Sequence, residues 1–330
     1  MLVRSIRLFN VASSLRNLIL MDTNVWMWIG FNLFVVFMLA LDLGVFHKKQ
    51  HEVKVKEALI WSAVWIALAL IFGAGVYYSM GHQKGLEFLT GYVVEKSLSI
   101  DNLFVFILLF GFFKVEPKLQ HRVLFWGVLG AIVLRAIFIF AGVALISKFH
   151  WVIYIFGAFL IYTGVKMLFE DDEKEVHPDK NPVVKWVKKI YPVAADDEKG
   201  SFFRRVNKKL HITPLFIVLI LIEVSDLIFA VDSIPAILSI SNDTYIVFTS
   251  NIFAIMGLRS LYFAVSEVMG LFRFLKYGLA AILAFVGVKM CISSYFEIPI
   301  GISLLFILGT VVISILLSKF VPATEKVRSK

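Results

Sequence analysis

Residues 213–240 read TPLFIVLILIEVSDLIFAVDSIPAILSI, an apolar run that carries the carboxylates Glu223, Asp226 and Asp232. About 20 apolar residues suffice for an α-helix to cross the roughly 30 Å hydrocarbon core of a bilayer. A helix satisfies its own backbone hydrogen bonds there. A carboxylate facing lipid costs roughly 2.5–3.5 kcal/mol on insertion scales. The run therefore predicts a membrane-spanning helix whose acids face protein, water or a cation.

The composition of the whole chain agrees with a membrane protein. Of 330 residues, 59% are hydrophobic and only 17% are charged, and the mean hydropathy is +0.85. A soluble fold of this size could not bury so much apolar surface. The single cysteine, Cys291, excludes a disulfide framework and a thiolate metal cluster. We interpret the net charge of +9 as Lys and Arg at cytoplasmic helix ends and not as a nucleic-acid surface.

Nine segments are long and apolar enough to span a membrane, so we expect an all-α polytopic fold with about nine transmembrane helices. The predicted spans are 24–46, 57–80, 87–113, 122–147, 151–170, 213–240, 245–266, 273–295 and 298–319.

Two regions lie outside these spans. Residues 171–212 are polar and predict a cytoplasmic loop that carries short helices. Residues 1–23 predict an interfacial extension, either as an amphipathic helix or as residues upstream of a true start at Met21. With nine spans, one face receives 23 Lys and Arg and the other 5. The positive-inside rule then places the N-terminus outside and the C-terminus in the cytoplasm.

The chain contains an internal repeat. Glu95-Lys-Ser-Leu-Ser-Ile-Asp101-Asn102 matches Asp226-Leu-Ile-Phe-Ala-Val-Asp232-Ser233, and two further matches follow in the same order. These are Leu134-Arg135-Ala136 with Leu258-Arg259-Ser260, and Gly164-Val-Lys-Met167 with Gly287-Val-Lys-Met290. Each copy, 87–170 and 213–295, holds three spans, so the second copy must be inverted. Two spans (24–86) precede the copies, and 296–330 holds the last span and the tail. Inverted repeats are typical of secondary transporters.

Carboxylates outnumber cations inside the predicted spans. Arg135, Arg259 and Lys289 are candidates for structural ion pairs, whereas Lys166 is expected to reach the cytoplasmic interface. The excess of acids favours a cation or proton pathway over a scaffold in which every acid is paired. Asn102 and Ser233 directly follow acids and add neutral oxygens. The candidate metal ligands are Asp42, Glu95, Asp101, Asn102, Glu223, Asp226, Asp232 and Ser233.

Helix geometry separates two of these acids. Asp226 and Asp232 point about 120° apart, because six residues turn by about 100° each. Either the span is locally unwound, or one acid serves the ion while the other pairs with an arginine. Pro235 favours a kink or a break nearby.

The residue chemistry points to a hard divalent cation as the substrate. All seven histidines fall in loops or at span ends, which disfavours Zn²⁺ and Cu⁺. Oxygen ligands suit Mn²⁺, Mg²⁺ and Ca²⁺ alike. The sequence has no Walker A, dinucleotide or HExxH motif, so we expect neither an enzyme nor a bound cofactor.

At these motifs the chain resembles the TerC family of integral membrane proteins, including its Alx-type members. The resemblance covers nearly all of 24–320 and rests on Leu41-Asp42-Leu43, on 95–102, and on Glu223-Val-Ser-Asp226 through Ala230-Val-Asp-Ser-Ile-Pro235. It implies Mn²⁺ export and metal homeostasis, with a historical link to tellurite resistance.

The prediction is therefore a secondary transporter in the inner membrane that exports divalent metal, Mn²⁺ by resemblance, in exchange for protons. One rival is a membrane scaffold or interaction protein in metal or tellurite stress. The other keeps transport but changes the ion to Ca²⁺, Mg²⁺ or protons alone. The expected partners are the metal ion, protons and the lipid bilayer, with no nucleic acid.

Overall fold

A computed structural model describes residues 25–46, 55–149, 151–169, 182–190, 192–194, 200–206, 209–266 and 274–320. The predicted extension 1–23 and the acidic start of the loop lie outside these residues. Asp42 and Asp101 fall within helices, but their side chains are not among those described.

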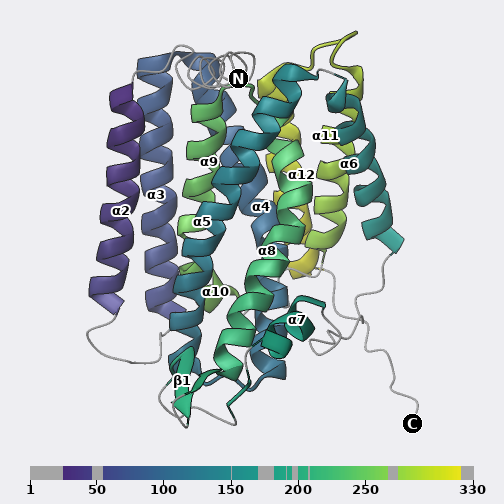
Figure 1. Cartoon of the computed structure of the whole chain (residues 1–330). Coiled ribbons are helices and arrows are strands. Elements are labelled where there is room, and N and C mark those ends of the chain that lie inside the picture. The colour runs from purple at the N-terminus through teal and green to yellow at the C-terminus, as the bar shows by residue number, and fades with distance from the viewer. Residues whose placement is uncertain are drawn as a thin grey trace, which may run out of the picture.

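The described chain is a bundle of long helices with a small appendage at one end (Figure 1). The bundle contains α2 (Val25–Phe46), α3 (Val55–Met80), α4 (His82–Phe112), α5 (Pro117–Lys148), α6 (Val152–Phe169), α8 (Pro214–Leu238), α9 (Thr244–Met256), α10 (Leu258–Val265), α11 (Leu275–Ile292) and α12 (Ile300–Phe320).

Every predicted span carries a helix, and the all-α polytopic prediction is confirmed. Six of the described helices are long and apolar enough to cross a membrane, namely α3, α5, α6, α8, α11 and α12. A seventh span results if α9 and α10 are one broken helix. The predicted total of nine stays a prediction, because α4 carries several charges and the described apolar part of α2 is short.

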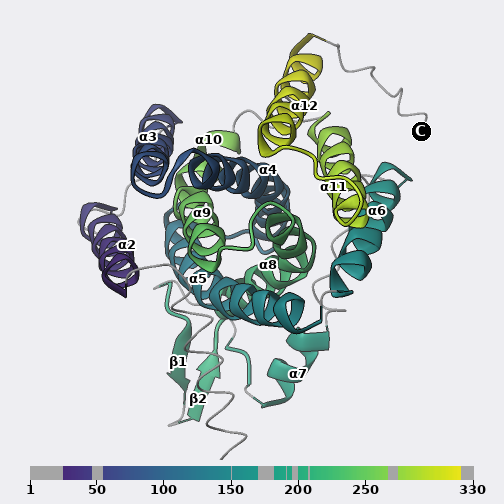
Figure 2. The same cartoon turned by 90° about the horizontal axis from the view of Figure 1, so that it is seen from above.

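The four central helices form a ring. Seen along the bundle, α4, α5, α8 and α9 surround the middle, while α2 and α3 lie on one side and α6, α11 and α12 on the other (Figure 2). Helix α4 packs on α8 and α9, α5 packs on α8 and α9, and α6 packs on α11. Helices α4 and α8 run in opposite directions, because Glu87 contacts Ser241 while Asn102, further along α4, contacts Asp226.

Helices α6 and α11 approach each other through glycines. A Cβ atom on Gly164 would lie 2.7 Å from the Ala280 carbonyl oxygen, and one on Gly287 would lie 2.6 Å from that of Gly157. Small residues allow this backbone approach between membrane helices. The matching Gly-Val-Lys-Met sequences of the two copies therefore lie on two helices packed against each other.

The predicted span 245–266 is broken. Helices α9 and α10 meet at Gly257 with a bend of 40°. A helix end leaves carbonyl groups without a helical partner. The ammonium of Lys96, on α4, donates to one of them, the Ala254 carbonyl, over 3.0 Å.

Helix α8, by contrast, is continuous from Pro214 to Leu238. A break at Pro235 is therefore wrong, because the helix continues for another three residues, whereas a kink there stays a prediction. Asp226 and Asp232 consequently lie on different faces of one continuous helix.

The polar loop contains a β-hairpin as well as a helix. Helix α7 (Pro182–Ile190) matches the expectation of short helices, but β1 (Phe203–Val206) and β2 (Lys209–Ile212) were not expected. A two-stranded hairpin needs outside packing for stability. Ile212 of β2 supplies it, because this side chain is buried in an apolar cluster with Leu215 and Val218 of α8. Just before β1, the Arg122 guanidinium of α5 lies 5.2 Å from the Phe202 ring centroid and donates to the Gly200 carbonyl over 2.9 Å.

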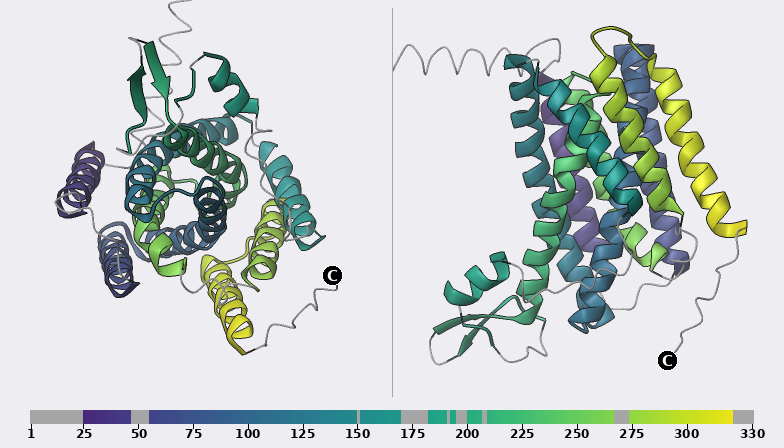
Figure 3. Two further views of the ribbon diagram at one scale, coloured as in Figure 1. Left: turned by 90° about the horizontal axis from the view of Figure 1, so that it is seen from below. Right: turned by 90° about the vertical axis from the view of Figure 1, so that its right-hand side faces the viewer.

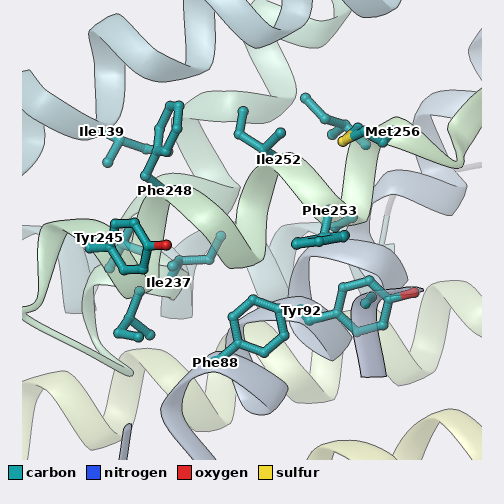
Figure 4. Close-up of a cluster of buried hydrophobic side chains, with 14 of the residues drawn as sticks. Phe88, Tyr92, Ile139, Ile237, Tyr245, Phe248, Ile252, Phe253 and Met256 are labelled. Atoms are coloured by element: carbon teal, nitrogen blue, oxygen red, sulfur yellow. The ribbon is translucent and has the colours of Figure 1, made fainter. Parts of the chain in front are cut away.

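The largest apolar cluster surrounds α9. Every residue from Thr244 to Met256 is buried, as expected of a helix that is apolar on all sides. Aromatic rings from α4 and α9 meet there, and Phe88 and Phe253 lie 6.0 Å apart between ring centroids (Figure 4). This cluster holds the ring of helices together beside the charged centre.

Candidate functional site

The charged centre is built around Arg135 of α5. Its guanidinium forms a salt bridge with Glu95 of α4 and donates to both carboxylate oxygens of Asp226 of α8, over 3.0 and 3.2 Å. Asn102 donates to Asp226 over 2.9 Å. These side chains are at most 3% exposed. One arginine of α5 thus joins carboxylates from α4 and α8.

A cavity of about 480 Å³ adjoins this centre. Its walls come from α4, α5, α6, α8 and α11, and they include Glu95, Asn102 and Arg135. Asp232 and Ser233 of α8 complete the polar lining. The exposed Tyr162 and Lys166 lie in the lining from the second half of α6.

Among the described residues, four buried oxygen atoms in this lining have no hydrogen-bond partner. They are Glu95 Oε2, Asn102 Oδ1, Asp232 Oδ1 and Ser233 Oγ. A buried polar atom without a partner costs about 1–3 kcal/mol. These oxygens therefore need water or a cation, and together they form a ligand set that hard divalent ions prefer.

The local charge also suits a cation. The carboxylates of Glu95, Asp226 and Asp232 outnumber the two basic groups at this site, the buried guanidinium of Arg135 and the exposed ammonium of Lys166, so ionised side chains leave one net negative charge. Thr163 of α6 lies beside the Asp232 carboxylate, and Lys166 lies near it. Within the described residues, no three His, Cys, Asp or Glu side chains form a group that could hold a metal. The candidate site therefore combines carboxylate oxygens with the amide of Asn102 and the hydroxyl of Ser233.

The structure divides the other sequence candidates. Glu223 lies outside the cavity lining and rests against Gly130 of α5. Arg259 is buried on α10, away from this lining. Lys289 lines a second cavity, of about 1030 Å³, where α4 begins and α8 ends. Asp42 belongs to α2, at the outside of the bundle in Figure 2.

Sequence reasoning missed two groups of polar residues. The first is Thr163, which lies beside Asp232. The only hint in the sequence was that Thr163 directly precedes the repeated Gly-Val-Lys-Met sequence. At the second cavity, Lys84 bridges Glu87 and Asp243 at 3.2 Å each, and Ser241 hydrogen-bonds Glu87 at 2.5 Å. An ion pair between Lys84 and Glu87 could have been predicted from their spacing of three residues on a helix. Their partners Ser241 and Asp243, on the connection between α8 and α9, could be found only from the folded structure.

A bundle of apolar helices around buried charges and a polar cavity defines a multi-pass integral membrane protein. Comparison with known families identifies which one. The family model described as "Integral membrane protein TerC family" matches residues 80–326, and the chain belongs to this family. The sequence resemblance is thereby confirmed.

Related proteins match along almost their whole length. A protein of Myxococcus xanthus, "Uncharacterized membrane protein STKORF319", is 50% identical over 303 residues, covering 91% of this chain and 95% of the relative. The Escherichia coli K12 protein named "Putative membrane-bound redox modulator Alx" is 46% identical over 304 residues, covering 89% and 94%. A Salmonella typhi protein of the same name is 47% identical over 305 residues, also covering 89% and 94%. No solved structure matches the chain.

Proposed function

We propose that this protein is a secondary transporter that exports Mn²⁺ across the bacterial inner membrane in exchange for protons. The observation that carries the proposal is the set of four unpartnered oxygens in one cavity, two from α4 and two from α8. Ionisable groups within a membrane protein mark ion pathways by default. Here the ionisable groups are the carboxylates of Glu95 and Asp232, which come from α4 and α8, the helices that carry the matching motifs of the two sequence copies.

The excess of carboxylates over basic groups in the cavity supports a cation as the substrate, and the set of oxygen ligands supports a hard divalent one. Oxygen ligands alone leave Mn²⁺, Mg²⁺ and Ca²⁺ equivalent. The choice of Mn²⁺ rests on the family resemblance, and the other two ions are the alternatives that the experiment must separate.

A second cavity supports transport by alternating access. It lies at the end of the bundle where Glu87 meets Ser241, whereas the central cavity lies near Asp232. One apolar cluster lies between the two cavities. It packs against Leu86, which lines the second cavity, and it includes Leu283, which lines the central cavity. Two separate cavities with apolar side chains between them suit a gated carrier better than an open pore.

The helix pairing supports the inverted repeat. If the two copies are related by a pseudo-two-fold axis, α4 corresponds to α8, α5 to α9 and α10, and α6 to α11. Such an axis predicts that a contact between α4 and α9 is matched by a contact between α8 and α5, and that α6 packs against its own equivalent, α11. All three contacts occur. We infer that the central cavity lies between the copies, as in other transporters with such repeats.

The rival reading is a scaffold in which the acids serve internal ion pairs. It accounts for Arg135 with Asp226, but leaves the unpartnered oxygens of Asp232 and Ser233 without a role. The names of the Alx relatives refer to redox modulation. A chain with one cysteine cannot form an internal disulfide, so we propose transport and no enzymatic activity of its own.

Purified protein in liposomes tests the proposal. Uptake of Mn²⁺, Mg²⁺ and Ca²⁺ is measured for wild type, Ser233→Ala and Ser225→Ala. The latter is a matched control, because the Ser225 hydroxyl on the same helix donates to the Leu221 carbonyl over 2.8 Å and does not line the cavity. We expect Mn²⁺ flux that Ser233→Ala weakens and Ser225→Ala leaves unchanged. Folded protein without any metal flux would favour the scaffold.

A further inference from the structure

Helix α7 lies beside one end of the bundle, outside the ring of helices (Figures 2 and 3). Viewed along the bundle axis it shows its side, whereas the bundle helices are seen more nearly end-on (Figures 2 and 3). Val184 of α7 is 1% exposed and belongs to an apolar cluster with Leu215 and Val218. Those two residues lie in the first turns of α8, a candidate membrane span. Helix α7 is therefore held at the level where a spanning helix begins, which is the membrane surface.

The side chains of α7 point in three directions. With about 100° per residue, Val184 and Val187 share the side that faces the bundle. Trp186 and Ile190 share a second side, on which they are 64% and 50% exposed.

The third side is basic. Lys185 and Lys189 are both exposed and lie about 40° apart around the helix. Their mean direction is roughly 100° away from that of Trp186 and Ile190. One exposed side of α7 is thus apolar and aromatic, and the other carries positive charge.

We propose that α7 is an interfacial anchor that binds the headgroups of anionic phospholipids. A helix held parallel to the membrane, with Trp on one exposed side and Lys on another, has the amphipathic pattern of interfacial helices. Trp186 and Ile190 enter the acyl boundary, and Lys185 and Lys189 contact lipid phosphates. The occupant is lipid because this surface lies beside the start of a membrane span and because its charge complements that of anionic lipid.

Labels at two neighbouring positions test this orientation. In a Cys291→Ser background, Ile190→Cys and Lys189→Cys are each labelled with a nitroxide, and the full chain is placed in nanodiscs with or without phosphatidylglycerol. Collision with oxygen reports lipid exposure, and collision with a water-soluble nickel chelate reports water exposure. With phosphatidylglycerol, we expect the label at 190 to favour oxygen and the label at 189 to favour the chelate.

The lysines supply the matched variant. Adding Lys185→Gln to the Ile190→Cys protein should move that label toward the chelate, as should phosphatidylcholine alone. Equal chelate accessibility at 189 and 190 in anionic nanodiscs would overturn the anchor. Oxygen preference at 190 that is independent of lipid charge would overturn headgroup binding, and a label shielded from both reagents would indicate a protein partner instead. Metal flux does not enter this test, so its result is independent of the proposed transport function.

Discussion

Replacing Asp226 and Asp232 by asparagine separately should have opposite consequences, although the two acids belong to one sequence motif. Asp226 accepts two hydrogen bonds from Arg135 and one from Asn102, and all three side chains are buried. Breaking a buried ion pair by removing one partner costs about 3–5 kcal/mol. We expect Asp226→Asn to cost about 3 kcal/mol, the lower end of that range, because Glu95 still pairs with Arg135.

Asp232→Asn should cost less than about 1 kcal/mol, because one of its carboxylate oxygens has no hydrogen bond to lose and an amide oxygen can retain the contact with Thr163. The same change removes a carboxylate charge from the cavity lining and with it the excess of acids over basic groups there. We therefore expect Mn²⁺ flux to be abolished in a protein that remains folded.

The assay pairs thermal unfolding of the detergent-solubilised protein with Mn²⁺ flux in liposomes. A loss of about 3 kcal/mol lowers the folded-to-unfolded ratio by roughly two orders of magnitude, since about 1.4 kcal/mol is one factor of ten. Asp226→Asn should thus unfold at a clearly lower temperature than Asp232→Asn. Equal unfolding temperatures for the two variants, or wild-type flux in Asp232→Asn, would refute the division of roles.

Three further predictions concern packing, topology and coupling. Gly164→Ala should destabilise the protein by about 1–3 kcal/mol, because its Cβ would lie 2.7 Å from a backbone oxygen of α11, whereas Gly309→Ala has no atom within 4 Å and should be tolerated in the same unfolding assay. A cysteine at Lys185 in a chain without Cys291 should react only with reagents that reach the cytoplasm, and labelling from outside would reverse the orientation. With the membrane potential clamped, an inward proton gradient should accelerate Mn²⁺ export, and Glu95→Gln or Glu223→Gln should weaken that acceleration, because crowded acids take up protons when the metal leaves. Flux that is indifferent to the gradient would rule out coupling.

The sequence sufficed for the architecture because lipid imposes a simple requirement. Each spanning segment must be long, apolar and helical, so the helices could be placed from composition and length. The motif around Asp226 and Asp232 could likewise be recognised as an unusual concentration of charge within apolar runs. The strands β1 and β2 could not be predicted in this way, because they are only four residues each and lie outside the membrane spans. Contacts that are distant in sequence, such as that of Arg122 with Phe202, place this segment.

The tertiary structure decided which polar groups meet. Sequence spacing placed Asp226 and Asp232 on different helix faces but could not choose between a broken helix and separate roles. The structure shows a continuous α8, and packing of α8 against α4, α5 and α6 puts Arg135 beside Asp226 and Thr163 beside Asp232. Hydrogen bonds between helices depend on the rotation and depth of each helix in the bundle, which are fixed by side chains far apart in the sequence. Residue type and period alone therefore determined the spans and the candidate ligands, whereas only the packed bundle determined which oxygens are left without partners.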